Sequence, residues 1–331
     1  MSWDIKKEIS SPKNYNIDEF TFESGDSLDN LNVEYVTLGT PELDSDNNLI
    51  NGVLYLHGWG GSCTSMKRLD PITGPEKPLD PEEVFIISPT ALGSPGSSAP
   101  STTSLGPNFP KYTITDMVNF HYEFLKEKFS IEHLKGVIGT SMGGFLALNW
   151  AVNYADYMDF LIPLVSSYQV KGLNFANFYF MNSLIEKDLE YNGGNYEKNP
   201  ERVTRLVSEF MYMFGLSKDY YRYELENKDI LKYMNQMGIE GSSMDANDII
   251  WRNNAAMGFD LENELSKISV KTLILAINQD QYFPPSQDAI PMSKMIKNSK
   301  IALFDSICGH IGTKDLYKVE NDIITFLKEF F

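Results

Sequence analysis

The chain has 331 residues, a formal net charge of −17, and hydrophobic side chains at 42% of its positions. This is enough apolar material for one large domain, or for a core with a subsidiary domain. The acidic balance excludes nucleic acid and anionic membranes as expected partners, because both require a basic face.

The cysteine count and the N-terminal residues indicate in which kind of compartment the protein is expected. Cys63 and Cys308 are too few for a disulfide framework, and no zinc-type ligand spacing is present, so we expect no metal. The first residues, MSWDIKKEIS, lack the apolar run of a secretion signal, and no segment is suited to spanning a membrane. We therefore expect a soluble, cytoplasmic protein.

The first half of the chain alternates between strand and helix patterns. Short apolar segments between turn residues predict strands at 33–38, 52–58, 83–90, 135–140 and 158–165. Helical spacing of apolar residues predicts helices at 113–129 and 143–155, and the Gly-, Ser- and Pro-rich residues 91–110 predict a long loop. This alternation indicates an α/β protein whose central sheet is mostly parallel and carries helices on both faces.

The pattern changes between about Val170 and Lys267. No strand is predicted there, and four helical segments rich in aromatic residues follow one another at 175–190, 200–214, 218–237 and 245–259. Strands at 270–277 and 300–305, a short helix within 284–298 and a helix at 316–331 then restore the alternation. The sequence predicts a catalytic core formed by 1–169 and 268–331, with residues 170–267 inserted as a helical lid.

One serine lies where a predicted strand turns into a predicted helix. Gly139-Thr140-Ser141-Met142-Gly143 fits the G-x-S-x-G pattern, in which small residues two positions before and after the serine permit a cramped turn. The helix after the turn directs its positive end toward the serine. A glycine-rich turn with a bystander serine is the alternative, so Ser141 needs partners before it can be called a nucleophile.

A nucleophilic serine needs a base, and the base needs a carboxylate to orient it. His310 follows the predicted strand 300–305, and Asp280 follows the predicted strand 270–277, in the chain order Ser, Asp, His. Asp305 and Asp288 are rival acids, but the first ends the strand before His310 and the second falls in the following helix. Ser141, Asp280 and His310 are the predicted catalytic triad.

The other three histidines receive different interpretations. His57 and Gly58 end the strand 52–58, and we interpret them as shaping an oxyanion loop rather than supplying the base. The backbone N–H groups of Trp59 and Met142 would then bind the developing oxyanion. His121 and His133 are predicted to be structural or exposed to solvent.

Five blocks of the sequence resemble the homoserine O-acetyltransferases of the α/β-hydrolase superfamily. They are GTSMGGFLALNWA, NFPKYTITDMVNFHYEFL, YNGGNY, MDANDIIWRNNAAMGFDL and DQYFPP. These blocks lie between residues 108 and 285, within the stretch of about residues 50–310 that the resemblance covers. The resemblance implies the α/β-hydrolase fold, the triad named above, a helical lid over the core and a homodimer formed through that lid. It also implies acetyl-CoA as a co-substrate if the enzyme is a transferase; otherwise no cofactor is expected.

Two departures from the family pattern concern the acyl acceptor. The family places an aspartate after the catalytic histidine to hold the acceptor's amino group, and this chain has Ile311 there. The family's acceptor-binding arginine is missing from the lid stretch MYMFGLSKDYY, and Lys218 and Arg222 are out of register. A polar substrate group without a partner loses transition-state binding. The departures therefore disfavour homoserine.

The sequence thus predicts a serine-dependent acyl-transfer enzyme acting on a small ester or thioester. Hydrolysis is the leading interpretation, and acyl transfer to homoserine or another small alcohol is the alternative. A non-catalytic ligand-binding protein of the same fold stays open as a second class, because fold does not determine function. A structural protein that assembles through the aromatic lid has only composition in its favour.

Overall fold

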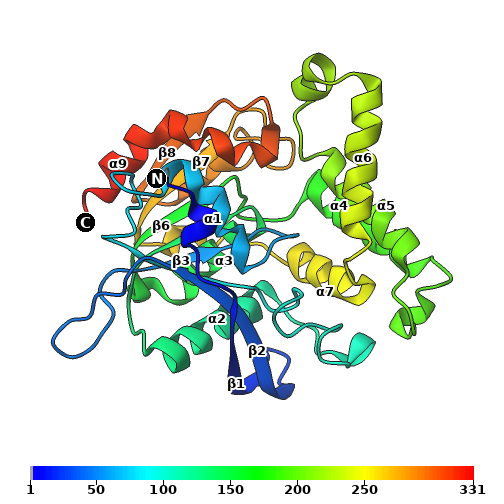
Figure 1. The fold of residues 1–331 in the computed structure, drawn as a ribbon, viewed down its shortest axis with the longest axis horizontal. Coiled ribbons are helices and arrows are strands. Elements are labelled where there is room, and N and C mark those ends of the chain that lie inside the picture. Colours follow the sequence, from blue (N-terminus) through cyan, green and yellow to red (C-terminus); the bar gives the residue numbers. More distant parts are fainter. Residues whose placement is uncertain (1–2) are drawn as a thin grey trace.

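The computed structural model describes residues 3–331 and places eight strands in one sheet (Figure 1). The strand order is β1-β2-β4-β3-β5-β6-β7-β8, and in this order the strands from β4 to β8 are mutually parallel. The bounds are β1 Lys13–Thr21, β2 Ser27–Leu38, β3 Gly52–Leu56, β4 Phe85–Pro89, β5 Leu134–Thr140, β6 Met158–Leu164, β7 Lys271–Ile277 and β8 Ser299–Phe304. The predicted fold class, a mostly parallel sheet of the α/β-hydrolase type, is confirmed.

The antiparallel edge of the sheet differs from the prediction. The sequence pattern does not predict β1, and β2 begins at Ser27 rather than at Val33. β1 pairs with β2 and β2 pairs with β4, both in antiparallel register. Polar residues fill most of β1, and only Ile17 and Phe20 are buried, so its alternation is too weak to predict a strand from sequence. It is formed because a longer neighbour offers it a hydrogen-bonding edge.

Each face of the sheet has its own hydrophobic core. In β3, Leu54 and Leu56 point to one face, whereas Val53 and Tyr55 point to the other. The first face is covered by α2 (Ile114–Phe129), α3 (Met142–Asn153) and α8 (Ala289–Met295). The second is covered by the 3-10 segments 63–72 and 309–319, by α1 (Ile5–Glu8) and by α9 (Glu320–Leu327). Helices therefore lie on both faces of the sheet.

The C-terminal helix is shorter than predicted. Residues 309–319 form 3-10 turns, and the α-helix begins only at Glu320 and ends at Leu327. One apolar face nevertheless runs through both segments, because Leu316, Val319, Ile323 and Phe326 are all buried in the same core. Gly312 has non-helical dihedral angles and interrupts the earlier turns.

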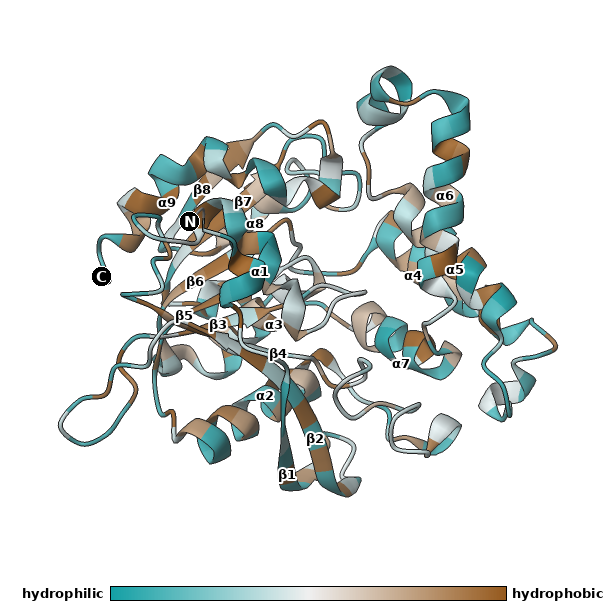
Figure 2. Cartoon of the chain, viewed as in Figure 1, coloured by the Kyte–Doolittle hydropathy of each residue, from teal (hydrophilic) through white to brown (hydrophobic). Residues whose placement is uncertain are grey.

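The helices between β6 and β7 gather on one side of the sheet (Figure 1). They are α4 (Gly172–Glu186), α5 (Glu201–Met213), α6 (Asn227–Gly241) and α7 (Ala246–Met257). The predicted helix at 218–237 is instead a π-helical turn, Tyr220–Glu224, followed by α6. Hydrophobic residues dominate the inner strands, whereas α5 and α6 show mixed hydropathy (Figure 2). We keep the word lid for residues 170–267; their separateness as a domain stays a prediction.

Among residues 3–331, none of the helices combines the length and the apolar character that crossing a membrane requires.

Candidate active site

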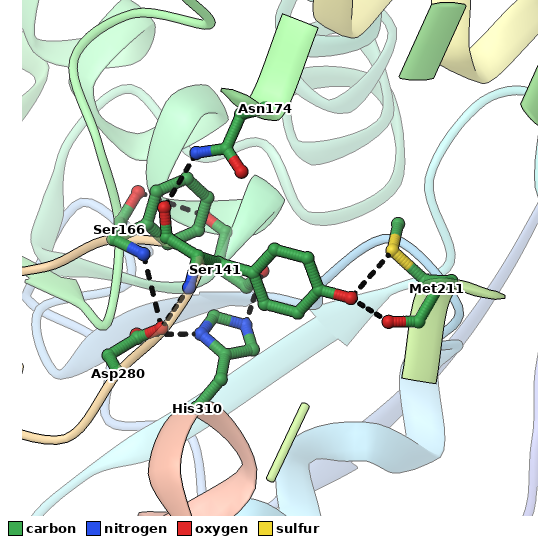
Figure 3. A network of polar contacts seen from close by, with 8 residues as sticks. Ser141, Ser166, Asn174, Met211, Asp280 and His310 are labelled. Atoms are coloured by element: carbon green, nitrogen blue, oxygen red, sulfur yellow. Dashed lines mark hydrogen bonds and ion pairs between the residues drawn. The ribbon is translucent and has the colours of Figure 1, made fainter. Parts of the chain in front are cut away.

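Ser141 follows the last residue of β5 and precedes the first residue of α3. Its backbone has φ 57° and ψ −123°, a conformation that L-residues other than glycine rarely adopt. The Ser141 N–H donates to Leu164 O across the strand end at 2.9 Å. Ser166 Oγ donates to Ser141 O at 2.9 Å, and Figure 3 shows these two serines. The neighbouring strand β6 and its loop therefore hold the strained turn in place.

Three glycines around Ser141 are required by close backbone approach. A Cβ atom on Gly139 would lie 2.0 Å from Gly143 O, and one on Gly143 would lie 2.1 Å from Leu56 O. A Cβ atom on Gly144 would lie 2.2 Å from Ser166 Oγ. The small residues of the G-x-S-x-G pattern are thus explained by space, as the steric argument from sequence predicts.

His310 and Asp280 complete a chain of hydrogen bonds that begins at Ser141 (Figure 3). Ser141 Oγ lies 2.9 Å from His310 Nε2, and His310 Nδ1 lies 2.7 Å from Asp280 Oδ2. The other carboxylate oxygen, Asp280 Oδ1, accepts the amides of Tyr282 at 2.8 Å and Phe283 at 3.1 Å. In this arrangement His310 Nδ1–H donates to the carboxylate, which leaves Nε2 free to take the serine proton.

The aromatic rings of Tyr282 and Phe283 hold the imidazole of His310 in place. Their centroids lie 5.0 and 5.5 Å from the imidazole centroid, both in edge-to-face geometry. The hydroxyl of Tyr282 in turn donates to the carbonyl of Met211 at the end of α5 (Figure 3). The loop after β7 therefore connects the acid, the base and the lid.

Trp59 and Met142 both line the cavity beside Ser141. Met142 is the first residue of α3, so its N–H has no acceptor within the helix. Gly58 lies so close to the serine that a Cβ atom on it would be 3.1 Å from Ser141 Cβ. The loop after β3 thus approaches the nucleophile closely, and the role of the Trp59 and Met142 amides as oxyanion donors stays a prediction.

His57 is not among the residues that line the cavity beside Ser141, and it connects two loops. Its Nε2 accepts the Ala91 N–H at 2.9 Å, and its Nδ1 lies 2.8 Å from Gly58 O. Burial lowers the pKa of His57 to about 4, so the ring is neutral near pH 7. A neutral ring with Nδ1–H donating and Nε2 accepting satisfies both contacts, which supports a loop-shaping role rather than a basic one.

Within the described residues, the remaining rivals make no hydrogen bond to Ser141, Asp280 or His310. His121 is buried, and burial lowers its pKa to about 3; His133 contacts Asp159 Oδ1 at 2.9 Å. Asp305 accepts from the side-chain amides of Asn278 and Gln279 at 2.9 and 3.0 Å. Asp288 is buried, burial raises its pKa to about 6, and it directly precedes the first residue of α8. Both cysteines are buried and free.

A cavity opens above Ser141 between the sheet and the lid. Its empty volume is about 890 Å³, part of it open to solvent. The core contributes Ser141 and His310, and the lid contributes residues from α4, from α5 and from the turn after α5. The lining residues are Gly58, Trp59, Gly60, Gly61, Ser65, Arg68, Thr140, Ser141, Met142, Phe145, Asn174, Asn177, Phe178, Met211, Tyr212, Gly215, Tyr282, Phe283, His310 and Ile311.

The charged residues of this lining determine which charged groups of a substrate could be paired in the cavity. Arg68 is the one lysine or arginine among the lining residues of the described chain, and no aspartate or glutamate is among them. Ile311 lines the cavity directly after His310, whereas Lys218 and Arg222 are exposed and lie outside it. No cluster of three potential metal ligands occurs within residues 3–331.

The sequence analysis missed several polar side chains of this cavity, among them Arg68, Asn177 and Tyr212. Arg68 lies in the 3-10 segment 63–72, where nothing in the local sequence marks it out. Asn177 and Tyr212 lie on lid helices, and the direction of a side chain on such a helix depends on how the helix packs. Only the structure could identify them.

Comparisons with known proteins place the chain among enzymes. Residues 51–313 match the family described as alpha/beta hydrolase fold. A probable acyltransferase of Methanothermobacter thermautotrophicus is 50% identical over 313 residues, covering 95% of this chain and 96% of that protein. A homoserine O-acetyltransferase of Methanosalsum zhilinae is 28% identical, covering 84% of this chain and 64% of that protein. The crystal structure of esterase E22 superposes with a TM-score of 0.85 at 22% identity, covering 96% of this chain and 100% of that one.

Proposed function

This chain belongs to the α/β hydrolase family of enzymes, and we propose that it hydrolyses a small ester or thioester through an acyl intermediate on Ser141. The observation that carries this proposal is the pair of contacts Ser141 Oγ–His310 Nε2 and His310 Nδ1–Asp280 Oδ2, at 2.9 and 2.7 Å. A nucleophile, a base and an orienting carboxylate in hydrogen-bond contact are what covalent acyl transfer requires.

The proposed reaction has two halves. Ser141 Oγ attacks the substrate carbonyl carbon as His310 Nε2 takes its proton, and the amides of Trp59 and Met142 bind the resulting oxyanion. The tetrahedral species collapses, the bond to the leaving oxygen or sulfur breaks, and His310 returns the proton to that leaving group. Water then attacks the acyl-enzyme with His310 as base, which releases the acid and regenerates Ser141. Asp280 supports the imidazolium in both halves.

The cavity lining favours hydrolysis over transfer to homoserine. Homoserine carries an ammonium group, and the lining offers no carboxylate to pair with it. Ile311 occupies the position directly after the base. Its side chain packs close to Gly215, since a Cβ atom added to that glycine would lie 3.4 Å from Ile311 Cγ2. Burying an ammonium group against an isoleucine would leave it without a hydrogen-bond acceptor. Water needs no such anchor.

Acetyl-CoA-dependent transfer to a small alcohol remains the second candidate. Two observations favour it: relatives named as acyltransferases, one of them 50% identical, and a lid that partly covers the nucleophile. Closing an active site against water suppresses hydrolysis of a reactive intermediate. The acceptor would then be an alcohol without an ammonium group.

Two assays on the purified protein separate these functions. We expect release of p-nitrophenol from p-nitrophenyl acetate, and no increase in thiol release from acetyl-CoA when homoserine is added. Homoserine-dependent thiol release would overturn the hydrolase proposal in favour of the transferase. The matched control is the Ser141→Ala variant, whose folding is compared by circular dichroism.

Covalent labelling tests the ligand-binding alternative. We expect a fluorophosphonate probe to label the wild-type protein at Ser141, as identified by mass spectrometry, and to leave the Ser141→Ala variant unlabelled. Absence of labelling in folded wild-type protein would favour a binding protein that does not turn over substrate.

We also propose that the protein forms a homodimer through the outer surface of α4 and α5. Large hydrophobic side chains are exposed there at Leu173, Phe175, Tyr179, Phe180, Leu206 and Met213. An exposed apolar surface of this kind marks an interaction site more often than an isolated exposed leucine does. Light scattering after size exclusion should give twice the chain mass, and Phe180→Asp should give the monomer. A wild-type monomer at high concentration would contradict this proposal.

A further inference from the structure

Arg252 on α7 contacts the loop that would bind the oxyanion. Its side chain is buried, with 4% of the residue exposed. Nη1 donates to Trp59 O at 2.7 Å, and Nη2 donates to Gly93 O at 2.9 Å. The guanidinium carbon also lies 5.4 Å from the centroid of the Trp59 ring. One lid side chain therefore holds both the carbonyl and the ring of Trp59.

The next residue of α7 holds the same tryptophan at a third point. Trp59 Nε1 donates to Asn253 Oδ1 at 2.7 Å, and Asn253 Nδ2 donates to Asn182 Oδ1 at 2.8 Å. Asn182 Nδ2 then donates to Asn254 Oδ1 at 2.9 Å, which connects α4 to α7. Trp59 is thus fixed by its carbonyl, its indole N–H and its ring face, all from consecutive residues of one helix.

The burial of Arg252 is costly and calls for an explanation. The described residues give its guanidinium two carbonyl acceptors and no carboxylate, and its Nε has no partner. The nearby carboxylate of Asp248 is bound by the amide and hydroxyl of Ser101 instead. A buried charge without an ion-pair partner is expensive, and an apolar side chain would fill this space at lower cost. Packing alone does not account for an arginine here.

We infer that Arg252 is a positioning residue that keeps the amide of Trp59 aimed at the oxyanion, and that through it the lid controls the rate of acyl transfer. Its two hydrogen bonds join the loop after β3 to the loop after β4. His57 joins the same two loops by accepting from Ala91. Oxyanion donors act only when preorganised at about 2.7–3.1 Å from the developing charge. A planar guanidinium can fix two carbonyls in one geometry, which a lysine cannot.

The inference rests on the proposed function and is tested with two substitutions. In Arg252→Met, kcat/KM for p-nitrophenyl acetate should fall by about 10- to 100-fold with KM little changed, because displacement of a catalytic donor by about 1 Å costs up to about 10². Arg252→Lys keeps the positive charge but loses the planar guanidinium that reaches both carbonyls. Its kcat/KM should therefore lie between those of Arg252→Met and the wild type.

A transition-state analogue distinguishes positioning from structure. A trifluoromethyl ketone forms a hemiketal with Ser141 whose oxygen occupies the oxyanion site. The affinity for the ketone should fall in parallel with kcat/KM, from the wild type through Arg252→Lys to Arg252→Met. The affinity for the product acetate should stay the same in all three proteins. The matched control is Arg222→Met, which removes an exposed lid arginine outside the cavity and should change neither value.

The outcomes are separable. Folded Arg252→Met with wild-type kcat/KM and ketone affinity overturns the inference. If Arg252→Met does not fold, Arg252→Lys decides, and wild-type values for that variant overturn it equally. Wild-type protein that neither turns over esters nor binds the ketone refutes the proposed function instead, so the two failures cannot be confused.

Discussion

Two walls of the same cavity hold their side chains in different ways. At the strand ends, Ser141 and Asp280 are fixed by main-chain amides and carbonyls, at distances between 2.8 and 3.1 Å. On the lid wall, the side chains of Asn177 and Tyr212 face the cavity, and within residues 3–331 no hydrogen bond is found for either. Main-chain groups therefore fix the predicted catalytic side chains, whereas Asn177 and Tyr212 keep their polar atoms available to a ligand.

The strand-end wall should be the more sensitive of the two. In Asp280→Asn, the amide can donate to His310 and favour the wrong tautomer, so kcat should fall by about 10⁴-fold with little change in KM. Initial rates measured over a range of p-nitrophenyl acetate concentrations give kcat and KM.

Ser141→Ala gives the lowest activity expected in the same assay, because loss of the nucleophile should lower kcat by about 10⁶-fold. Thermal melts should show that both variants stay folded, because in Asp280→Asn the Tyr282 and Phe283 amides can still donate to the carbonyl oxygen of the new side chain. A tenfold or smaller loss in Asp280→Asn would contradict the assignment of Asp280 as the orienting acid.

The same contrast explains how much could be predicted from the sequence. Strand ends could be located because β5, β7 and β8 are short apolar segments between turn residues, and parallel strands bring their carboxyl ends to one edge. That argument selects Ser141, Asp280 and His310, and the structure brings them into contact. Their catalytic roles stay predictions.

The side chains away from the strand ends could not be predicted in the same way. Arg252 is one residue in a helical pattern, and its meaning depends on Trp59, which lies 193 positions earlier. Arg68 is one exposed arginine among several charged residues, and only the packing of the segment 63–72 turns it toward the cavity. The strand β1 was missed for a related reason, since pairing with β2 rather than local alternation forms it.

A carboxylate beside His310 should make the cavity favour a different acceptor. In Ile311→Asp, the new acid can pair with an ammonium group, and hydrogen bonds to charged groups contribute about 1.5–3 kcal/mol. We therefore expect the ratio of homoserine acetylation to acetyl-CoA hydrolysis to rise by about 10- to 100-fold. Mass spectrometry of O-acetylhomoserine and total thiol release give the two rates.

The matched variant Ile311→Asn separates charge from size, since it fills the same space without a negative charge. It should raise the ratio far less than the aspartate does. Equal ratios in the aspartate, asparagine and wild-type proteins would show that the acceptor site is limited elsewhere, and would weaken the argument from Ile311.

The smallest expected effect concerns Arg68, the cation that lines the cavity from outside the lid. Because the side chain is exposed, its pairing with a substrate anion should contribute only about 0.2–1 kcal/mol. Arg68→Ala should therefore lower kcat/KM for p-nitrophenyl hemisuccinate by about 1.4- to fivefold and leave kcat/KM for p-nitrophenyl acetate unchanged.

Two controls make so small an effect interpretable. Lys67→Ala removes a neighbouring exposed cation that does not line the cavity, so it should not discriminate between the two esters. The discrimination by Arg68 should also shrink as salt rises from low ionic strength, since exposed charges are screened over about 10 Å at 0.1 M. Equal losses for both esters would mean that Arg68 supports the loop rather than the substrate. The cavity would then hold no charge that selects among acyl groups, and selection would depend on the neutral side chains of the lid.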